Sequence, residues 1–186
     1  LKKYFFEIKN ISEKIVNEFG IQNDPIYFQF LIGEEGLKVN EIACRIGGAY
    51  EGDFMPALTG VDILEMMVRL AAGEPVKQKA LQNYSIQANH KYLSSQLFFA
   101  GPGKITDITD DFELLELEGV LKAGFNYKAG DLIPDIENAT ARAGHFIVLA
   151  DNKVELEQRV TAVYDKLKII DQCGKNLVYR EIGENF

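Results

Sequence analysis

Three polar side chains between residues 26 and 45 are the ones best suited to chemistry. They are Gln29, Glu41 and Arg45, which offer an amide oxygen, a carboxylate and a guanidinium. Magnesium takes oxygen ligands and usually binds one or two protein carboxylates, while phosphates and water complete its octahedron. A guanidinium can clamp a phosphate or carboxylate through paired N–H donors. These side chains would therefore suit a magnesium–phosphate site if they lay on one face of one element.

A β-hairpin would bring these side chains together. The runs 27–32 and 37–43 are rich in aromatic and β-branched residues, which is typical of strands. Between them we expect a three-residue loop, 34–36, because such loops commonly place a left-handed glycine at their last position and Gly36 stands there.

This loop sets the register of the hairpin. It pairs Gly33 with Leu37, and counting back along both strands places Gln29 opposite Glu41. Because side chains alternate between the faces of a strand, Arg45 follows on the same side as Glu41. A slip of one residue would separate Gln29 from Glu41. The alternative interpretation is an exposed acid–amide pair without a ligand, which is common on sheet surfaces.

Composition limits the classes of protein to which the chain can belong. The chain has 186 residues, of which 47% are hydrophobic, and this is enough for one domain or two small ones. The formal net charge of −8 argues against a nucleic-acid partner, although a nucleotide site needs only a few local cations. No apolar run reaches the length of a membrane span, and the N-terminal residues lack the features of a signal peptide.

The cysteines and the first residue add two expectations. Cys44 and Cys173 form no metal-binding pattern, so a reducing cytoplasm fits this chain. Cys44 has the parity of the apolar face of its strand, which predicts a small buried side chain. The chain begins with Leu rather than Met, which indicates a fragment or a processed product.

The order of the expected elements favours the α+β class, because strands and helices mix without a regular βα alternation. We expect an irregular loop over 47–59 and a polar connection over 74–92 that joins two domains, 1–88 and 89–186. Apolar periodicity and capping residues predict helices at 3–19, 62–72 and 151–167, with one or two helical turns at 110–117. The expected strands beyond the hairpin are 92–100, 104–108, 120–127, 145–150 and 176–183.

Two segments around the hairpin resemble the ATP-grasp ligase superfamily. FQFLIGEEGLKVNEIACRIGG resembles the paired metal-site strands of these enzymes, and TGVDILEMMVRLAAGEP resembles the helix that follows them. Further along, QLFFAGPGKI and ATARAGHFIVLADNKVELEQRVTAVYDKL resemble the C-terminal β-rich domain of the amino-acid ligase branch and, less closely, the end of biotin carboxylase. The resemblance implies that 1–88 is the distal half of an ATP-grasp domain, an antiparallel sheet with helices. Residues 89–186 would form a small β-rich C-terminal domain.

The resemblance also implies a role for each residue. Glu41 falls on the acid that ligates Mg²⁺ or Mn²⁺ at the ATP phosphates, and Gln29 falls on the second ligand position, as in the carbamoyl-phosphate synthase type. Arg45 falls on the catalytic arginine that contacts the transferred phosphate or the acyl phosphate. Ala43 stands where many members carry an asparagine ligand. The implied reaction is activation of a small-molecule carboxylate by ATP, followed by attack of an amine.

The family also needs an earlier ATP-binding half with phosphate-binding lysines. We therefore expect the missing N-terminal ATP-grasp half as a partner, and we expect this chain alone to be inactive. A homodimer is one possible assembly, and neither nucleic acid nor membrane is expected as a partner. A hypothesis from a different class stays open, namely a non-catalytic binding or oligomerisation module that keeps the fold of a ligase end.

Two further groups have both a functional and a structural interpretation. Glu51 and Asp53 could contact the amine substrate, or they could simply belong to a solvated acidic loop. Arg142 and His145 could form a substrate or dimer contact, or an ordinary loop–strand junction.

Overall fold

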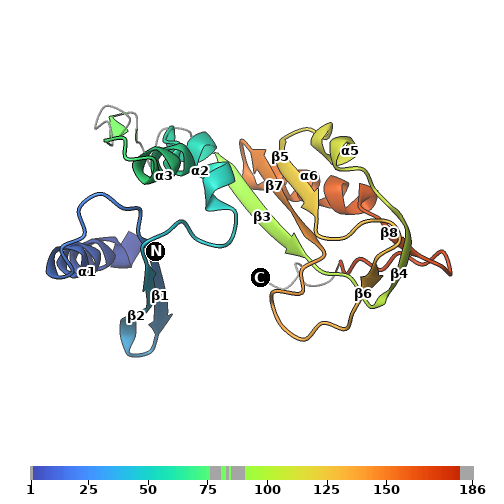
Figure 1. The fold of residues 1–186 in the computed structure, drawn as a ribbon, viewed down its shortest axis with the longest axis horizontal. Coiled ribbons are helices and arrows are strands. Elements are labelled where there is room, and N and C mark those ends of the chain that lie inside the picture. The colour runs from blue at the N-terminus through green and yellow to red at the C-terminus, as the bar shows by residue number, and fades with distance from the viewer. Residues whose placement is uncertain (1, 76–80, 83, 85–90, 181–186) are drawn as a thin grey trace. The chain divides into compact units, whose positions relative to one another are not determined.

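The structure of the chain is a computed structural model that describes residues 2–75, 81–82, 84 and 91–180 (Figure 1). The chain divides into two compact units, Leu1–Ala88 and Asn89–Phe186. Most of the connection expected at 74–92 lies outside the described residues.

The first unit contains helices and a two-stranded antiparallel sheet. Its elements are η1 (Lys2–Tyr4), α1 (Phe5–Glu18), β1 (Tyr27–Gly33), β2 (Gly36–Ala43), α2 (Glu51–Thr59) and α3 (Ile63–Ala71) (Figure 1). The predicted first helix and the predicted hairpin are therefore confirmed. A left-handed Gly20 with φ of 64° follows α1, because a residue without Cβ adopts this conformation at little cost.

The hairpin has the predicted pairing of Gln29 with Glu41, but its turn and its regularity differ from the prediction. Gly33 pairs with Gly36, so the turn is the two-residue Glu34–Glu35 and the expected three-residue loop is wrong. Further along, Phe30 pairs with Val39 but Gln29 pairs with Glu41. Asn40 is therefore an extra residue, a β-bulge in β2. The shorter turn and the bulge each shift the pairing by one residue and cancel, so Gln29 does lie opposite Glu41.

The segment after the hairpin departs from the expectation of an irregular loop. It forms α2, with Pro56 inside the helix and Tyr50 before it in the left-handed region, at φ of 65° and ψ of 32°. Two acidic residues in the first turn, Glu51 and Asp53, favour a helix start because they face the positive end of the helix dipole. A proline removes only one N–H donor from such a short helix, so it did not prevent the helix from forming.

Helix α3 begins as the sequence predicts. The side chain of Asp62 accepts a hydrogen bond of 2.8 Å from the backbone N–H of Glu65, which makes Asp62 the N-cap. Gly73, with φ of 80°, follows the end of the helix.

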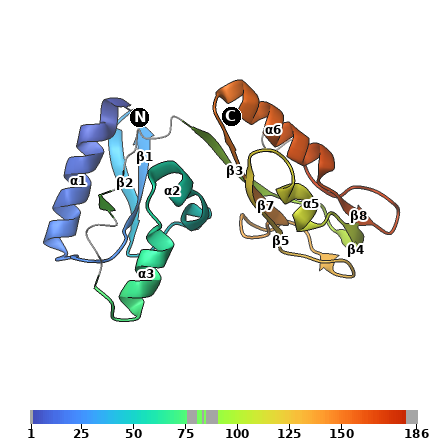
Figure 2. The ribbon, with the colours of Figure 1, turned by 90° about the horizontal axis from the view of Figure 1, so that it is seen from above.

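The second unit has two three-stranded antiparallel sheets, in the strand orders β3-β7-β5 and β6-β4-β8. Helix α6 contacts β7 and β3 of the first of these sheets (Figure 2). The elements are β3 (Tyr92–Phe98), β4 (Gly103–Ile108), α5 (Asp111–Leu115), β5 (Val120–Phe125), β6 (Leu132–Ile133), β7 (Gly144–Ala150), α6 (Lys153–Lys166) and β8 (Ile169–Asp171). This mixture of helices and antiparallel sheets confirms the predicted α+β class.

Two short strands of this unit were not predicted, and one prediction was only partly right. β6 and β8 have two and three residues, and both pair with β4. In the tail expected to be a strand over 176–183, Asn176 and Val178 form single bridges, and the last three residues of that range lie outside the described part.

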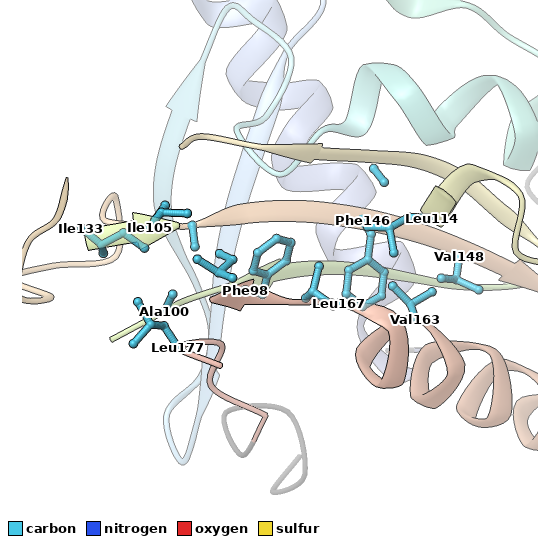
Figure 3. Packing of buried hydrophobic residues seen from close by; sticks show 13 residues of the cluster. Phe98, Ala100, Ile105, Leu114, Ile133, Phe146, Val148, Val163, Leu167 and Leu177 are labelled. Atoms are coloured by element: carbon cyan, nitrogen blue, oxygen red, sulfur yellow. The ribbon is translucent and has the colours of Figure 1, made fainter. Parts of the chain in front are cut away.

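The core of the second unit is built on β7, which is buried along its whole length. The ring of Phe146 is fully buried among other apolar side chains (Figure 3). It contacts Tyr164 of α6 edge-to-face, with 5.1 Å between ring centroids. Phe98 of β3 lies beside it, at 6.3 Å between centroids. Asn152 caps α6 by accepting a hydrogen bond from the backbone N–H of Glu155.

The first unit is much less buried. Among the described residues of 1–88, the buried hydrophobic side chains are Leu37 and Val61. Its large exposed hydrophobic residues include Phe5, Phe6, Phe19, Leu31, Ile32, Val39, Leu64 and Val68. In the part of the chain that the structure describes, no helix has the length and apolar character needed to cross a membrane.

Candidate functional site

The register of the hairpin brings Gln29 and Glu41 together. They are direct cross-strand partners, so their side chains share one face of the sheet. Because Asn40 is the bulged residue, both Asn40 and Glu41 lie opposite Gln29. The side-chain amide of Asn40 donates a hydrogen bond to Oε1 of Gln29. An amide oxygen and a carboxylate thus lie side by side, with a second amide bound to the first.

Arg45 joins this pair, but not because the strand continues. β2 ends at Ala43, and the chain then bends, with the backbone N–H of Arg45 bonded to the carbonyl of Ala43 at 2.9 Å. The guanidinium turns back and contacts Oε1 of Glu41 through Nη2 at 3.1 Å. The three predicted site residues are therefore neighbours, although alternation along a strand does not explain the position of Arg45.

Two further contacts hold the guanidinium of Arg45. Its Nη1 donates to the carbonyl oxygen of Ile46 at 2.9 Å, and its Cζ lies 5.5 Å from the ring centroid of Tyr27. A cation over an aromatic face at this distance gains about 0.5–1 kcal/mol at an exposed site. The same bend exposes Cys44, so the prediction of a buried Cys44 is wrong, because the strand parity on which it rested ends at Ala43.

The side chains of this site fit a divalent cation only in a limited way. In the described part of the chain, no group of three or more His, Cys, Asp or Glu residues gathers to hold a metal ion. The hairpin instead offers one carboxylate, from Glu41, and one amide oxygen, from Gln29, while Ala43 adds no donor. Such a pair suits Mg²⁺ that takes most of its ligands from phosphate and water, and it does not suit a metal enclosed by protein.

The ion pair between Glu41 and Arg45 is weak enough to exchange. The two side chains are 46% and 50% exposed, and exposed pairs contribute about 0.2–1 kcal/mol. A cation at Glu41 or an anion at Arg45 can therefore replace it at small energetic cost.

The acidic residues Glu51 and Asp53 lie in the first turn of α2 rather than in an irregular loop. Glu51 is partly buried and turns back over the preceding loop, where its Oε2 accepts a hydrogen bond of 2.9 Å from the backbone N–H of Ala49. The carboxylate lies against Gly47, since a Cβ built there would be 2.2 Å from Oε1. Asp53 lies in the first turn of α2, and its backbone N–H bonds the carbonyl of Tyr50.

Arg142 and His145 belong to the second unit. His145 is buried on β7 between Leu97 and Gly124, and Arg142 donates from Nε to the carbonyl of Ala139 at 3.1 Å. Burial, and then the charge of Asp110, raise the pKa of the Asp111 carboxyl, while His145 acts in the opposite direction. This electrostatic interaction links α5 to β7.

Comparisons with known proteins agree with this architecture. Residues 96–171 match a family model described as L-amino acid ligase C-terminal domain 2. A search of curated proteins finds no significant match. Among solved structures, phosphoribosylglycinamide synthetase from Anaerococcus prevotii has a TM-score of 0.76 at 15% identity over 92% of this chain and 43% of its own. L-amino acid ligase from Bacillus licheniformis has a TM-score of 0.73 at 17% identity over 92% of this chain and 42% of its own.

A third similar structure is biotin carboxylase from Campylobacter jejuni in complex with β,γ-ATP, with a TM-score of 0.57 at 18% identity over 77% of this chain and 31% of its own. This chain has the fold of part of an ATP-grasp ligase. The fold that the sequence resemblance implies is thereby confirmed. The chain spans less than half the length of each of these three structures.

Within this ATP-grasp fold, sequence reasoning missed Asn40 and Tyr27 at the candidate site and did not predict the contacts that Glu51 makes. Asn40 was not predicted, although the adjacent polar residues Asn40 and Glu41 break the alternation of β2, which is a signal for a bulge. The roles of Tyr27 beneath Arg45 and of Glu51 against Gly47 have no local sequence signal, because both depend on how the chain bends after Ala43.

Proposed function

We propose that this chain is the C-terminal part of an ATP-dependent carboxylate–amine ligase that works through an acyl phosphate. ATP and Mg²⁺, or Mn²⁺, would be its cofactors, and a small carboxylate and a small amine its substrates. The observation that carries the proposal is the convergence of Gln29, Glu41 and Arg45 on one side of the hairpin. Gln29 in place of a carboxylate makes the ligand pair similar to that of the carbamoyl-phosphate synthase type.

Each side chain has a distinct role in this proposal. Glu41 and the Oε1 of Gln29 hold the divalent cation at the ATP phosphates, where the cation neutralises phosphate charge. Glu41 exchanges its ion pair with Arg45 for the cation, and the guanidinium of Arg45 becomes available to the transferred phosphoryl group. Tyr27 keeps the guanidinium near the hairpin during this exchange.

The proposal includes the N-terminal half of the ATP-grasp domain as a partner of the first unit. This unit has few buried hydrophobic residues among those described, while aromatic and aliphatic side chains such as Phe6, Phe19 and Val68 are more than half exposed. A two-stranded sheet is also marginally stable by itself. Both features are expected of a unit that another segment covers. Without that segment, we expect no turnover of ATP.

A cytoplasmic location is part of the same proposal. Cys44 and Cys173 are free and exposed, which fits a reducing compartment.

One observation favours a second candidate, a non-catalytic module that has kept the fold. Both oxygen donors already have partners inside the chain, since Asn40 donates to Gln29 and Arg45 contacts Glu41. Such a hairpin could persist without any nucleotide.

Calorimetry on the full-length protein separates the two candidates. The titrants are Mn²⁺ and a non-hydrolysable ATP analogue, added to the native protein and to the Glu41→Ala variant, with Glu34→Ala in the exposed hairpin turn as the control. We expect Glu41→Ala to weaken cation binding about tenfold or more and Glu34→Ala to leave it unchanged. Unchanged affinity in Glu41→Ala would remove Glu41 from the site and favour the module. A screen of amino acids for ATP-dependent phosphate release then identifies the substrates.

A further inference from the structure

We propose that Glu51 is a positioning residue that fixes the guanidinium of Arg45 by holding the segment 46–49 in place. Only the expected effect of Glu51 on the ligase reaction rests on the proposed function. The structural link between Glu51 and Arg45 can be tested without it.

The first step is the contact between Glu51 and the loop before α2. Its Oε2 accepts the backbone N–H of Ala49 at 2.9 Å, and its carboxylate fills the space where Gly47 would carry a Cβ. That Cβ would lie 2.2 Å from Oε1, 2.5 Å from Cδ and 2.9 Å from Oε2. Gly47 has no left-handed φ, so space for the carboxylate, rather than backbone conformation, requires glycine at this position.

The second step leads from this loop to Arg45. Nη1 of Arg45 donates to the carbonyl of Ile46, the residue directly before Gly47. The side chain of Ile46 lies near α2, since a Cβ built on Gly52 would be 3.7 Å from its Cδ1. The first turn of α2 therefore holds the acceptor of Arg45 from two sides, through the carboxylate of Glu51 and through the packing of Ile46.

The direction of the Glu51 carboxylate favours this positioning role over a contact with the substrate. A carboxylate that contacts the amine substrate should be directed away from its own backbone, but Glu51 turns back onto Gly47 and accepts the amide of Ala49. Glu51 acts on the site through Arg45.

A double-mutant cycle in the full-length protein tests the coupling. We measure kcat, KM for ATP and Tm for Glu51→Ala and Glu51→Gln, each in the native background and with Arg45→Ala, with Glu34→Ala as the control. Glu51→Ala should lower kcat/KM about tenfold in the native background and less than about twofold with Arg45→Ala. Glu51→Gln should retain most activity, because its amide oxygen can still accept the Ala49 N–H. An equal loss in both backgrounds, or no loss at all, would overturn the proposal.

A second experiment does not require activity. Gly47→Ala should displace the carboxylate, so NMR should show increased mobility of the Arg45 Nε–H in Gly47→Ala and in Glu51→Ala. The double variant should be no worse than Glu51→Ala alone, because removing the carboxylate makes room for the methyl group. If Arg45 stays as rigid as in the native protein in both single variants, the proposal is wrong. A protein without ligase activity in which Arg45 does loosen would refute the proposed function and leave the positioning role intact.

Discussion

Deletion of Asn40 tests how the hairpin brings Gln29 opposite Glu41. Phe30 pairs with Val39, and Asn40 stands between that pair and the next one. Removing Asn40 makes Glu41 the residue after Val39, so a regular ladder would still place it opposite Gln29. We expect the deletion to keep the register of the hairpin and to remove only the bulge.

The expected loss of stability is small, because the deletion removes few interactions. The hydrogen bond from Asn40 to Gln29 is exposed, and such a bond contributes about 0.5–1.5 kcal/mol. A slip of β1 by one residue would instead turn Phe28 and Phe30 toward solvent, and both are half-buried. A fully buried side chain contributes about 1.5–3 kcal/mol and a partly buried one roughly half of that, so exposing both rings would cost about 1.5–3 kcal/mol.

The assay combines urea unfolding with cross-strand NOEs between Gln29 and Glu41. In the Asn40 deletion, the NOEs should remain and the free energy of unfolding should fall by less than about 1.5 kcal/mol. The control is a deletion of Leu31, which lies in β1 where the pairing is regular and must shift the register. If deleting Asn40 abolished the NOEs as completely as deleting Leu31, the reasoning about the bulge would be refuted.

Three further predictions concern stability. Phe146→Ala should reduce the free energy of unfolding of the second unit by about 3–5 kcal/mol in urea titrations, because the ring is fully buried. A loss below about 1 kcal/mol, as expected for an exposed side chain, would contradict this. Asp62→Ala should cost about 1 kcal/mol by removing the N-cap of α3, and Asp62→Asn should restore it. Burial raises the pKa of the Asp111 carboxyl in the folded protein, because it disfavours the ionised form. The ionised carboxylate therefore destabilises the fold as the pH rises through this raised pKa. The destabilisation disappears below the pKa that the carboxyl has in the unfolded chain. Asp111→Asn should therefore stabilise the protein at neutral pH but not at strongly acidic pH, and an equal gain in both would refute the assignment.

Much of the fold could be predicted because its signals are local. The strands of the hairpin, the cap of α3 at Asp62 and the helix after Asn152 all follow from side-chain periodicity and capping chemistry within a few residues. The register at Gln29 was also predicted, although through an incorrect turn that the bulge at Asn40 compensated. A hairpin turn and a bulge differ by single residues, and periodicity alone does not locate them.

By itself, the sequence determined which residue types stand at the candidate site and the strands that carry Gln29 and Glu41, because alternation and pairing are properties of neighbouring residues. Only the tertiary structure decided that Arg45 returns to Glu41 after the strand has ended, and that Glu51 fills the space beside Gly47. It also decided that β6 and β8 exist, since strands of two or three residues form only where β4 supplies their hydrogen-bond partners. These features depend on bends in the chain and on pairings between segments that are separate in the sequence. A local sequence pattern therefore does not predict them.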